Sequence, residues 1–193
     1  MKIASYFRTR KAASAEARKR QDFQRIALPH LNAAYRLARW LARNHDDAEE
    51  IVQEAYLSAY RHFDSYRGGD ARAWILTIVR NMFYSALRQR QAVTEAFDED
   101  VHNQPAESLG KGAWNGPDPE AALLRSENAA IVRDAVEALP VELREVLVLR
   151  TFDELSYCEI AAVANIPIGT VMSRLSRARQ QLAHRLKPMN GEP

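Results

Sequence analysis

The chain has 193 residues, of which 47% are apolar and 27% are charged, and its formal net charge is +2. This length suits one medium domain or two small ones, and no apolar run approaches the roughly 20 residues that cross a bilayer. The N-terminus offers no signal peptide because Arg8, Arg10 and Lys11 interrupt any apolar stretch. We therefore expect a cytoplasmic protein that does not insert into membranes.

Several classes of active site have no counterpart in the sequence. Cys158 is the only cysteine, which excludes an internal disulfide. A redox-sensing role is an alternative to a plain helix residue, but no resolving cysteine supports it. The five histidines show no metal-ligand spacing, and neither a Gly-rich phosphate loop nor a Ser/His/Asp pattern is present. We predict no catalytic residues, no metal and no cofactor, which argues against an all-α enzyme.

The charge is unevenly distributed along the chain. Residues 1–21 form a basic arm, in which seven lysines and arginines are accompanied by Glu16 alone. Residues 91–120 carry seven acidic side chains and only one basic one, whereas residues 160–191 carry no acidic side chain. The chain therefore consists of a basic arm, a mixed domain, an acidic middle and a domain that ends in a basic helix.

Residues 22–90 predict a helical domain. Pro29 suits the first turn of a helix that runs to Arg43, and apolar residues recur on one face of that helix. Asp47 followed by Glu50 has the pattern of a capping box for a second helix, which continues the apolar stripe.

A break and a linker follow this pair of helices. Arg67-Gly68-Gly69 interrupts the apolar periodicity, and Asp70 then caps a long helix to about Arg90. Residues 91–117 lose all periodicity and combine acidic side chains with helix breakers, which predicts an acidic flexible linker. The breakers are Pro105, Gly110, Gly112, Gly116 and Pro117.

Residues 118–187 predict a second helical domain, followed by a tail at 188–193. Asp118-Pro119 opens its first helix, and Pro140 ends that helix and starts the next. No segment shows the sustained two-residue alternation of a strand. The predicted fold class is all-α, with two small helical domains joined by the flexible linker.

A helix-turn-helix pattern lies in the second domain. Ser156 and Glu159 form a capping box for a short helix, Asn165-Ile166-Pro167 is a turn, and a second helix runs from about Gly169 past Leu182. The exposed face of that second helix carries hydroxyl and guanidinium groups, which read base edges and hold phosphates. The alternative is a solvated basic face on a core helix. The predicted face consists of Thr170, Met172, Ser173, Arg174, Ser176, Arg177 and Arg179.

Three stretches together resemble a known family. Residues 46–57, DDAEEIVQEAYL, look like region 2.2 of bacterial sigma factors. Residues 63–81, notably YRGGDARAWI, look like regions 2.3 and 2.4, and residues 155–179, notably IGTVMSRL, look like region 4.2. Their order, split by a linker, resembles the small extracytoplasmic-function (ECF) type of RNA polymerase sigma factor over about residues 22–187.

The resemblance implies a function and a set of binding residues. A protein of this family directs core RNA polymerase to promoter DNA for transcription initiation, and an anti-sigma factor holds it inactive until a stress signal arrives. Residues 22–90 would be region 2, which binds core polymerase and the −10 element. Residues 118–187 would be region 4, whose predicted helix face binds the −35 element. The implied −10 residues are Arg67, Arg72, Trp74, Arg80, Asn81 and Arg88.

Two of these assignments have alternatives. Glu50, Gln53 and Glu54 share one helix face and would dock on core polymerase, but they would equally form a solvated acidic face. Trp74 would stack on DNA or, since its stripe neighbours are apolar, belong to the core. At the level of the whole chain, the alternative is a stand-alone helix-turn-helix regulator that binds an operator as a dimer. That function would leave residues 46–57 unexplained.

Overall fold

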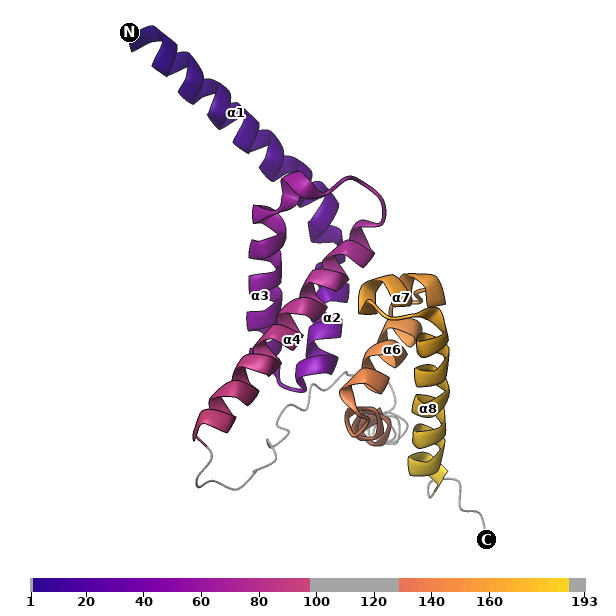
Figure 1. The fold of residues 1–193 in the computed structure, drawn as a ribbon. Coiled ribbons are helices and arrows are strands. Elements are labelled where there is room, and N and C mark those ends of the chain that lie inside the picture. Colours follow the sequence, from indigo (N-terminus) through magenta and orange to yellow (C-terminus); the bar gives the residue numbers. More distant parts are fainter. Residues whose placement is uncertain (1, 98–128, 188–193) are drawn as a thin grey trace, which may run out of the picture.

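The computed structural model describes residues 2–97 and 129–187, whose regular elements are all helices (Figure 1). The N-terminal part consists of α1 (Lys2–Ala27), the 3-10 helix η1 (Leu28–His30), α2 (Leu31–Ala42), α3 (His45–Arg61), the 3-10 helix η2 (Phe63–Ser65) and α4 (Ala71–Phe97). The C-terminal part consists of helical residues 129–137, α6 (Val141–Thr151), α7 (Tyr157–Ala164) and α8 (Ile168–Leu186). The predicted all-α fold class is confirmed, and most of the predicted linker, residues 98–117, lies outside the described residues.

The first domain is a bundle in which α2, α3 and α4 pack against one another. Each helix contributes an apolar stripe, and the largest contributors, such as Leu37 and Leu41 of α2 and Leu76 and Val79 of α4, are almost fully buried. Burial of such a side chain contributes about 1.5–3 kcal/mol. This core fixes the faces that α3 and α4 turn outward, where the predicted binding residues lie.

The start of α3 differs from the predicted capping box. Asn44 is the N-cap, and its Oδ1 accepts a hydrogen bond from the Asp46 backbone N–H at 2.9 Å. Asp47 instead accepts two hydrogen bonds from Arg90, at 2.6 and 2.8 Å, which join the start of α3 to the end of α4. The prediction was wrong because Asn is as good a cap as Asp and stands earlier in the chain.

Two helices are longer than predicted. From Lys2 on, the predicted arm and the residues that follow it form one continuous helix, α1. At the other end of the domain, α4 continues from Arg90 to Phe97 and so enters the predicted linker. Residues 91–97 contain neither Gly nor Pro, so nothing in the local sequence ends the helix at Arg90.

The second domain contains the predicted helix-turn-helix. The Ser156–Glu159 capping box is confirmed, with Glu159 N–H donating to Ser156 Oγ at 3.3 Å and Ser156 N–H donating to the Glu159 carboxylate at 2.7 Å. Asn165 adopts the left-handed conformation, with φ of 52°, that ends α7. α8 starts at Ile168, directly after Pro167, and packs on both α6 and α7.

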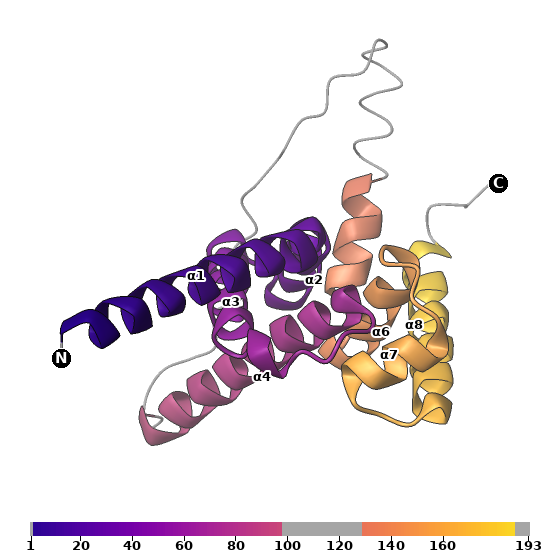
Figure 2. The same ribbon diagram turned by 90° about the horizontal axis from the view of Figure 1, so that it is seen from above.

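The two domains lie side by side. Contacts join α4 to α7 and α2 to α6, and one cluster of buried apolar residues continues from the first domain into the second. Figure 2 shows α6 and α7 between the first bundle and α8, which occupies the outer side. Among the helices described here, none is long and apolar enough to span a membrane.

Candidate nucleic-acid interface

The outer face of α8 is largely polar and mostly open. Val171, Leu175 and Ala178 are buried against the rest of the domain. Of the seven predicted residues, Thr170 and Arg174 are half-buried and the other five are exposed. Because α8 lies on the side of its domain away from α2 and α4 (Figures 1 and 2), this face is open to a large partner.

Two residues of this face, Ser173 and Arg174, already interact with other groups of the protein. The Ser173 hydroxyl donates to the Thr170 carbonyl at 3.0 Å, so its proton is already used within the helix. The positive charge of Arg174 acts on the buried carboxyl of Glu145 in α6 and opposes the rise of its pKa. Ser176, Arg177 and Arg179 are exposed, which leaves these three as the most accessible polar groups of the face.

The predicted −10 loop connects η2 to α4. Gly68 and Gly69 have φ of 86° and 97°, values that strain any residue with a side chain. Tyr66 closes the loop by donating its hydroxyl to the Gly69 carbonyl at 2.7 Å. Arg67 is exposed at its tip.

An aromatic cluster supports this loop. The Trp74 ring lies 4.8 Å from that of Tyr66 and 6.3 Å from that of Phe63, between ring centroids. All three rings are half-buried. Trp74 thus packs against other aromatic rings of the protein, as the core alternative requires. Part of its surface stays exposed.

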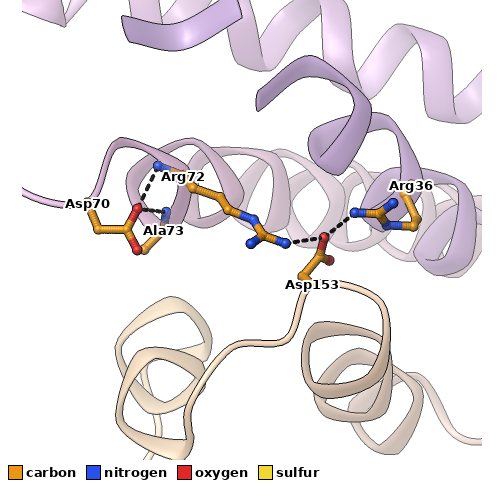
Figure 3. Close-up of polar contacts among 5 residues, drawn as sticks. All are labelled: Arg36, Asp70, Arg72, Ala73 and Asp153. Atoms are coloured by element: carbon orange, nitrogen blue, oxygen red, sulfur yellow. Dashed lines mark hydrogen bonds and ion pairs between the residues drawn. The ribbon is translucent and has the colours of Figure 1, made fainter. Parts of the chain in front are cut away.

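Arg72 is held by the second domain. Asp70 caps α4 as predicted, accepting hydrogen bonds from the backbone N–H groups of Arg72 and Ala73 at 2.9 and 3.2 Å. The Arg72 side chain reaches across to Asp153, in the turn after α6, and donates to its Oδ1 at 2.9 Å (Figure 3). Arg36 of α2 donates to the same oxygen at 2.5 Å. Asp153 is fully buried, while the side chains of Arg36 and Arg72 are about one-third exposed.

Arg80 is held in a similar way. Its Nε donates to Glu145 Oε1 at 2.5 Å, and the Tyr84 hydroxyl donates to Glu145 Oε2 at 3.0 Å. Burial raises the pKa of Glu145, and Arg80 opposes that rise. Burial, followed by the neighbouring Glu145 charge, raises the pKa of Tyr84 as well. Two of the predicted −10 cations therefore bind carboxylates of the second domain.

The remaining −10 residues lie apart from this contact. Asn81 and Arg88 are exposed on α4, and Arg80 Nη1 lies 3.5 Å from Asn81 Oδ1. The structure thus brings Arg67, Arg72 and Trp74 together at the start of α4 and leaves Arg88 near its far end.

Sequence reasoning missed the residues that pair with Arg72 and Arg80 between the domains, Asp153 and Glu145, and also Arg36, which shares Asp153. Glu145 had a signal, since it and Arg144 interrupt the apolar run from Leu143 to Leu149, where a buried charge requires a partner. Asp153 and Arg36 had none, because a charged residue in a turn or on a helix surface is ordinary.

The predicted polymerase-docking face is open. Glu50, Gln53 and Glu54 are exposed on α3, and Leu57, one turn further on, is 50% exposed. Next to this face a groove of about 790 Å³ runs between α3 and α4. Its walls include Glu50, Glu54, Ile51, Met82, Phe83 and Leu87. Arg43, Arg90 and Arg144 also line the groove, so the acidic character belongs to the exposed face of α3, which suits a protein partner with basic and apolar side chains.

The search for metal-binding chemistry gave nothing in the described part of the chain. No group of three or more His, Cys, Asp or Glu side chains there could hold a metal ion. Cys158 is exposed on α7 and has no disulfide partner.

Comparisons with known proteins agree with this geometry. Family models described as "Sigma-70 region 2" and "Sigma-70, region 4" match residues 26–93 and 129–182. The chain is 35% identical over 144 residues to the ECF RNA polymerase sigma-E factor of Escherichia coli K12, covering 74% of this chain and 75% of that protein. It is 34% identical over 172 residues to the ECF RNA polymerase sigma factor SigE of Mycolicibacterium smegmatis, covering 89% of this chain and 64% of that protein.

Two solved structures share the fold. The sigma factor RpoE of Bartonella quintana, crystallised with the anti-sigma factor NepR, is 31% identical with a TM-score of 0.69, and the match covers 86% of this chain and 98% of that one. CnrH, in complex with the cytosolic domain of CnrY, is 23% identical with a TM-score of 0.59, covering 92% of this chain and 95% of that one. The CnrH likeness extends to the fold alone.

Proposed function

Because this chain belongs to the ECF family of RNA polymerase sigma factors, we propose that its two domains bind core polymerase and the two promoter elements through the surfaces described above. Such a protein performs no chemistry of its own. It would act in the cytoplasm, where the polymerase and the chromosome meet.

We assign the −35 element to the outer face of α8. Ser173, Ser176 and Arg177 would face base edges, and Arg179 would hold a phosphate. Arg174 would contribute less than Arg179 to phosphate binding, since it is half-buried and its charge acts on Glu145. The absence of acidic residues from 160 to 191 favours a polyanion at this surface.

The −10 element is assigned to the loop before α4 and to the start of that helix. Arg67 is exposed at the loop tip, and Trp74 keeps part of its ring open, so both are available to a single strand. In the structure the two domains are in contact, which we call the closed arrangement. In it, Arg72 binds Asp153 and Arg80 binds Glu145. For these two cations to meet phosphates, the domains must separate.

Core polymerase is assigned to the exposed face of α3 and the neighbouring groove. The observation that carries the proposed function is this second surface, formed by Glu50, Gln53 and Glu54 beside an apolar groove, in a chain that also presents a helix-turn-helix. A stand-alone regulator would require only the helix-turn-helix.

Run-off transcription tests the proposal. Purified core polymerase, this protein and the genomic fragment upstream of its own gene are combined, and we expect a transcript of one defined length that depends on both proteins. Promoter binding without polymerase, together with no transcript, would instead identify a stand-alone regulator.

An anti-sigma factor is a further proposed partner. The RpoE structure that this chain resembles was solved with one, and a sigma factor without such a partner would compete constantly for polymerase. Co-purification of the tagged protein from its own cells, before and after stress, tests this assignment.

A further inference from the structure

The N-terminal helix α1 extends well beyond the match to the region 2 family model. The match to the region 2 family model begins at residue 26, whereas α1 covers Lys2–Ala27. Nearly all of α1 therefore precedes the matched domain. In both views its N-terminal half projects away from the bundle as a free-standing helix (Figures 1 and 2).

The other half of α1 is fixed to the end of α3 and to η2. Phe23 is buried, and its ring meets Tyr60 and Phe63 edge to face, at 5.2 and 5.4 Å between centroids. Lys19 Nζ donates to Asp64 Oδ2 at 2.6 Å, and the Tyr60 hydroxyl donates to the Glu16 carboxylate. η2, which α1 contacts through these bonds, leads directly into the glycine loop. The direction of α1 is therefore fixed relative to the loop and the start of α4, to which the −10 element is assigned.

The N-terminal part of α1 carries a large excess of positive charge. Its first nineteen residues, 2–20, hold seven cationic side chains and one acidic one. The acidic one, Glu16, is engaged by Tyr60, and one cation, Lys19, is engaged by Asp64. Arg18 and Arg20, on either side of Lys19, are exposed. Besides Lys19, the sequence places six cations on α1, of which Arg18 and Arg20 are the ones described as exposed: Lys2, Arg8, Arg10, Lys11, Arg18 and Arg20.

The spacing of these cations separates two kinds of anionic partner. At 3.6 residues per turn their positions are spread around the helix axis. A helix that lies on a lipid surface needs an apolar face opposite its basic one, and this distribution provides none. A nucleic acid requires only a high density of positive charge near its backbone.

The length of α1 fits such a partner. From Lys19, beside η2, to Lys2 the helix rises about 26 Å, at ~1.5 Å per residue. That length corresponds to roughly seven or eight nucleotide steps at ~3.4 Å each. A strand that left the glycine loop along the direction of α1 would have a basic helix beside it over most of one helical turn of DNA.

We propose that α1 is an additional nucleic-acid-binding element, which holds backbone phosphates of the promoter DNA flanking the −10 element without reading its sequence. This inference rests on the proposed function, since it places the promoter at the glycine loop. Binding by α1 adds affinity that falls with salt and leaves base preference to the loop and to α8.

The test uses the full chain in holoenzyme with core polymerase. Arg8→Gln, Arg10→Gln and Lys11→Gln are combined, because Gln keeps the helix propensity of the residues it replaces. Promoter affinity is measured against salt concentration. Each lost phosphate contact should lower the slope of log K against log salt by about 0.7–0.9, so the triple variant should lose up to roughly 2–3.

Further variants sharpen the measurement. Arg18→Gln with Arg20→Gln, both nearer the loop, should lower the slope by up to about 1–2. Arg133→Gln removes an exposed cation from the second domain and should leave the slope unchanged. Base preference at both promoter elements should stay as in the wild type.

The outcomes distinguish this inference from the proposed function. If wild-type holoenzyme does not recognise a promoter at all, the proposed function fails. If it does, and the triple variant keeps the wild-type slope, the role of α1 is refuted. If the triple variant binds core polymerase more weakly while the salt slope of promoter binding is unchanged, α1 contacts the polymerase, and the inference is overturned. A changed base preference in the triple variant would overturn it as well.

Discussion

Arg177 and Arg179 stand two positions apart on α8, and both are exposed. At 3.6 residues per turn they point to nearly opposite sides of the helix, so one DNA groove cannot offer both the same partner. Arg177 shares a stripe with Ser173 and Ser176, opposite the buried Leu175, and is the candidate for a bidentate contact to guanine. Arg179 is the candidate for a phosphate contact.

Substitution of the two arginines should therefore have different effects on promoter binding. Arg177→Ala should relax preference at one base pair by about 1–3 kcal/mol. Arg179→Ala should weaken all promoter variants equally and lower the salt slope by about one. Both are measured as holoenzyme on a set of −35 variants. If Arg177→Ala weakens every promoter equally while Arg179→Ala changes base preference, the two roles are reversed. If neither matters, α8 does not read the promoter.

Gln53 and Glu54 are exposed on α3, and Glu54 forms part of the groove wall together with Ile51. The double change Gln53→Ala with Glu54→Arg should abolish co-purification with core polymerase, because it removes a polar contact and reverses a charge. Helical content measured by circular dichroism should stay the same, since neither side chain is buried. Asp134→Arg, an exposed charge reversal in the second domain, is the matched control. Unchanged polymerase binding by the double variant would refute the docking face.

At the scale of the element, the Ser156–Glu159 capping box fixes the start of α7 and thereby the first helix of the helix-turn-helix. Ser156→Ala leaves the Glu159 N–H without its acceptor and should cost about 1 kcal/mol of stability, within ~0.5–2. Urea denaturation of the full chain, followed at 222 nm, measures the loss. Ser156→Asn keeps a cap of equal quality and should stay near the wild type; an equal loss in both variants would mean that the cap is not the cause.

The same box has a pH dependence. Hydrogen bonds from Ser156 hold the pKa of the Glu159 carboxyl below its ordinary value. A group with a lowered pKa in the folded state stabilises the fold above its ordinary pKa, and that contribution is lost as pH falls through the lowered value. Glu159→Gln should therefore reduce stability at neutral pH and flatten its decline with acid. An identical acid profile in the variant would exclude this contribution.

How far the sequence predicts each element depends on where its signals lie. The Ser156 box was predicted correctly because both of its partners are three residues apart. The cap of α3 was not, since Asn44 and Asp47 both have cap chemistry and only the structure shows that Asp47 binds Arg90. The exposed face of α8 followed from periodicity alone. The pairing of Arg72 with Asp153 joins residues 81 positions apart, and no local pattern encodes it.

At the scale of the whole molecule, the closed arrangement and promoter binding require different distances between the two domains. The two promoter elements lie one and a half to two helical turns apart, roughly 50–70 Å. In the structure, by contrast, α4 and α7 are in contact and Arg72 and Arg80 bind carboxylates of the second domain. Promoter binding therefore requires these ion pairs to open, and the carboxylates compete with phosphate for the same two cations.

The contact at Asp153 is built so that it can open. One carboxylate oxygen serves both Arg36 and Arg72, while the other, Oδ2, is buried without a hydrogen-bond partner among the described residues. An unsatisfied buried acceptor costs free energy that hydration would recover. Both arginine side chains are already about one-third exposed, and Arg36 Nε is likewise buried without a hydrogen-bond partner among the described residues, so hydration of the opened contact would offset part of the cost of losing the ion pairs.

Asp153→Asn tests whether this contact holds the domains together. The change removes the charge that attracts both arginines and keeps the shape of the side chain, so the domains should separate while each stays folded. Small-angle scattering should show a larger radius of gyration than for the wild type, at unchanged helical content. Asp134→Asn, an exposed change in the same domain, should leave the radius unchanged. Arg72→Gln should expand the molecule less, because Arg36 still binds Asp153. If Asp153→Asn scatters like the wild type, the Asp153 ion pairs do not control closure, and the Arg80–Glu145 pair and the apolar contacts hold the domains without them.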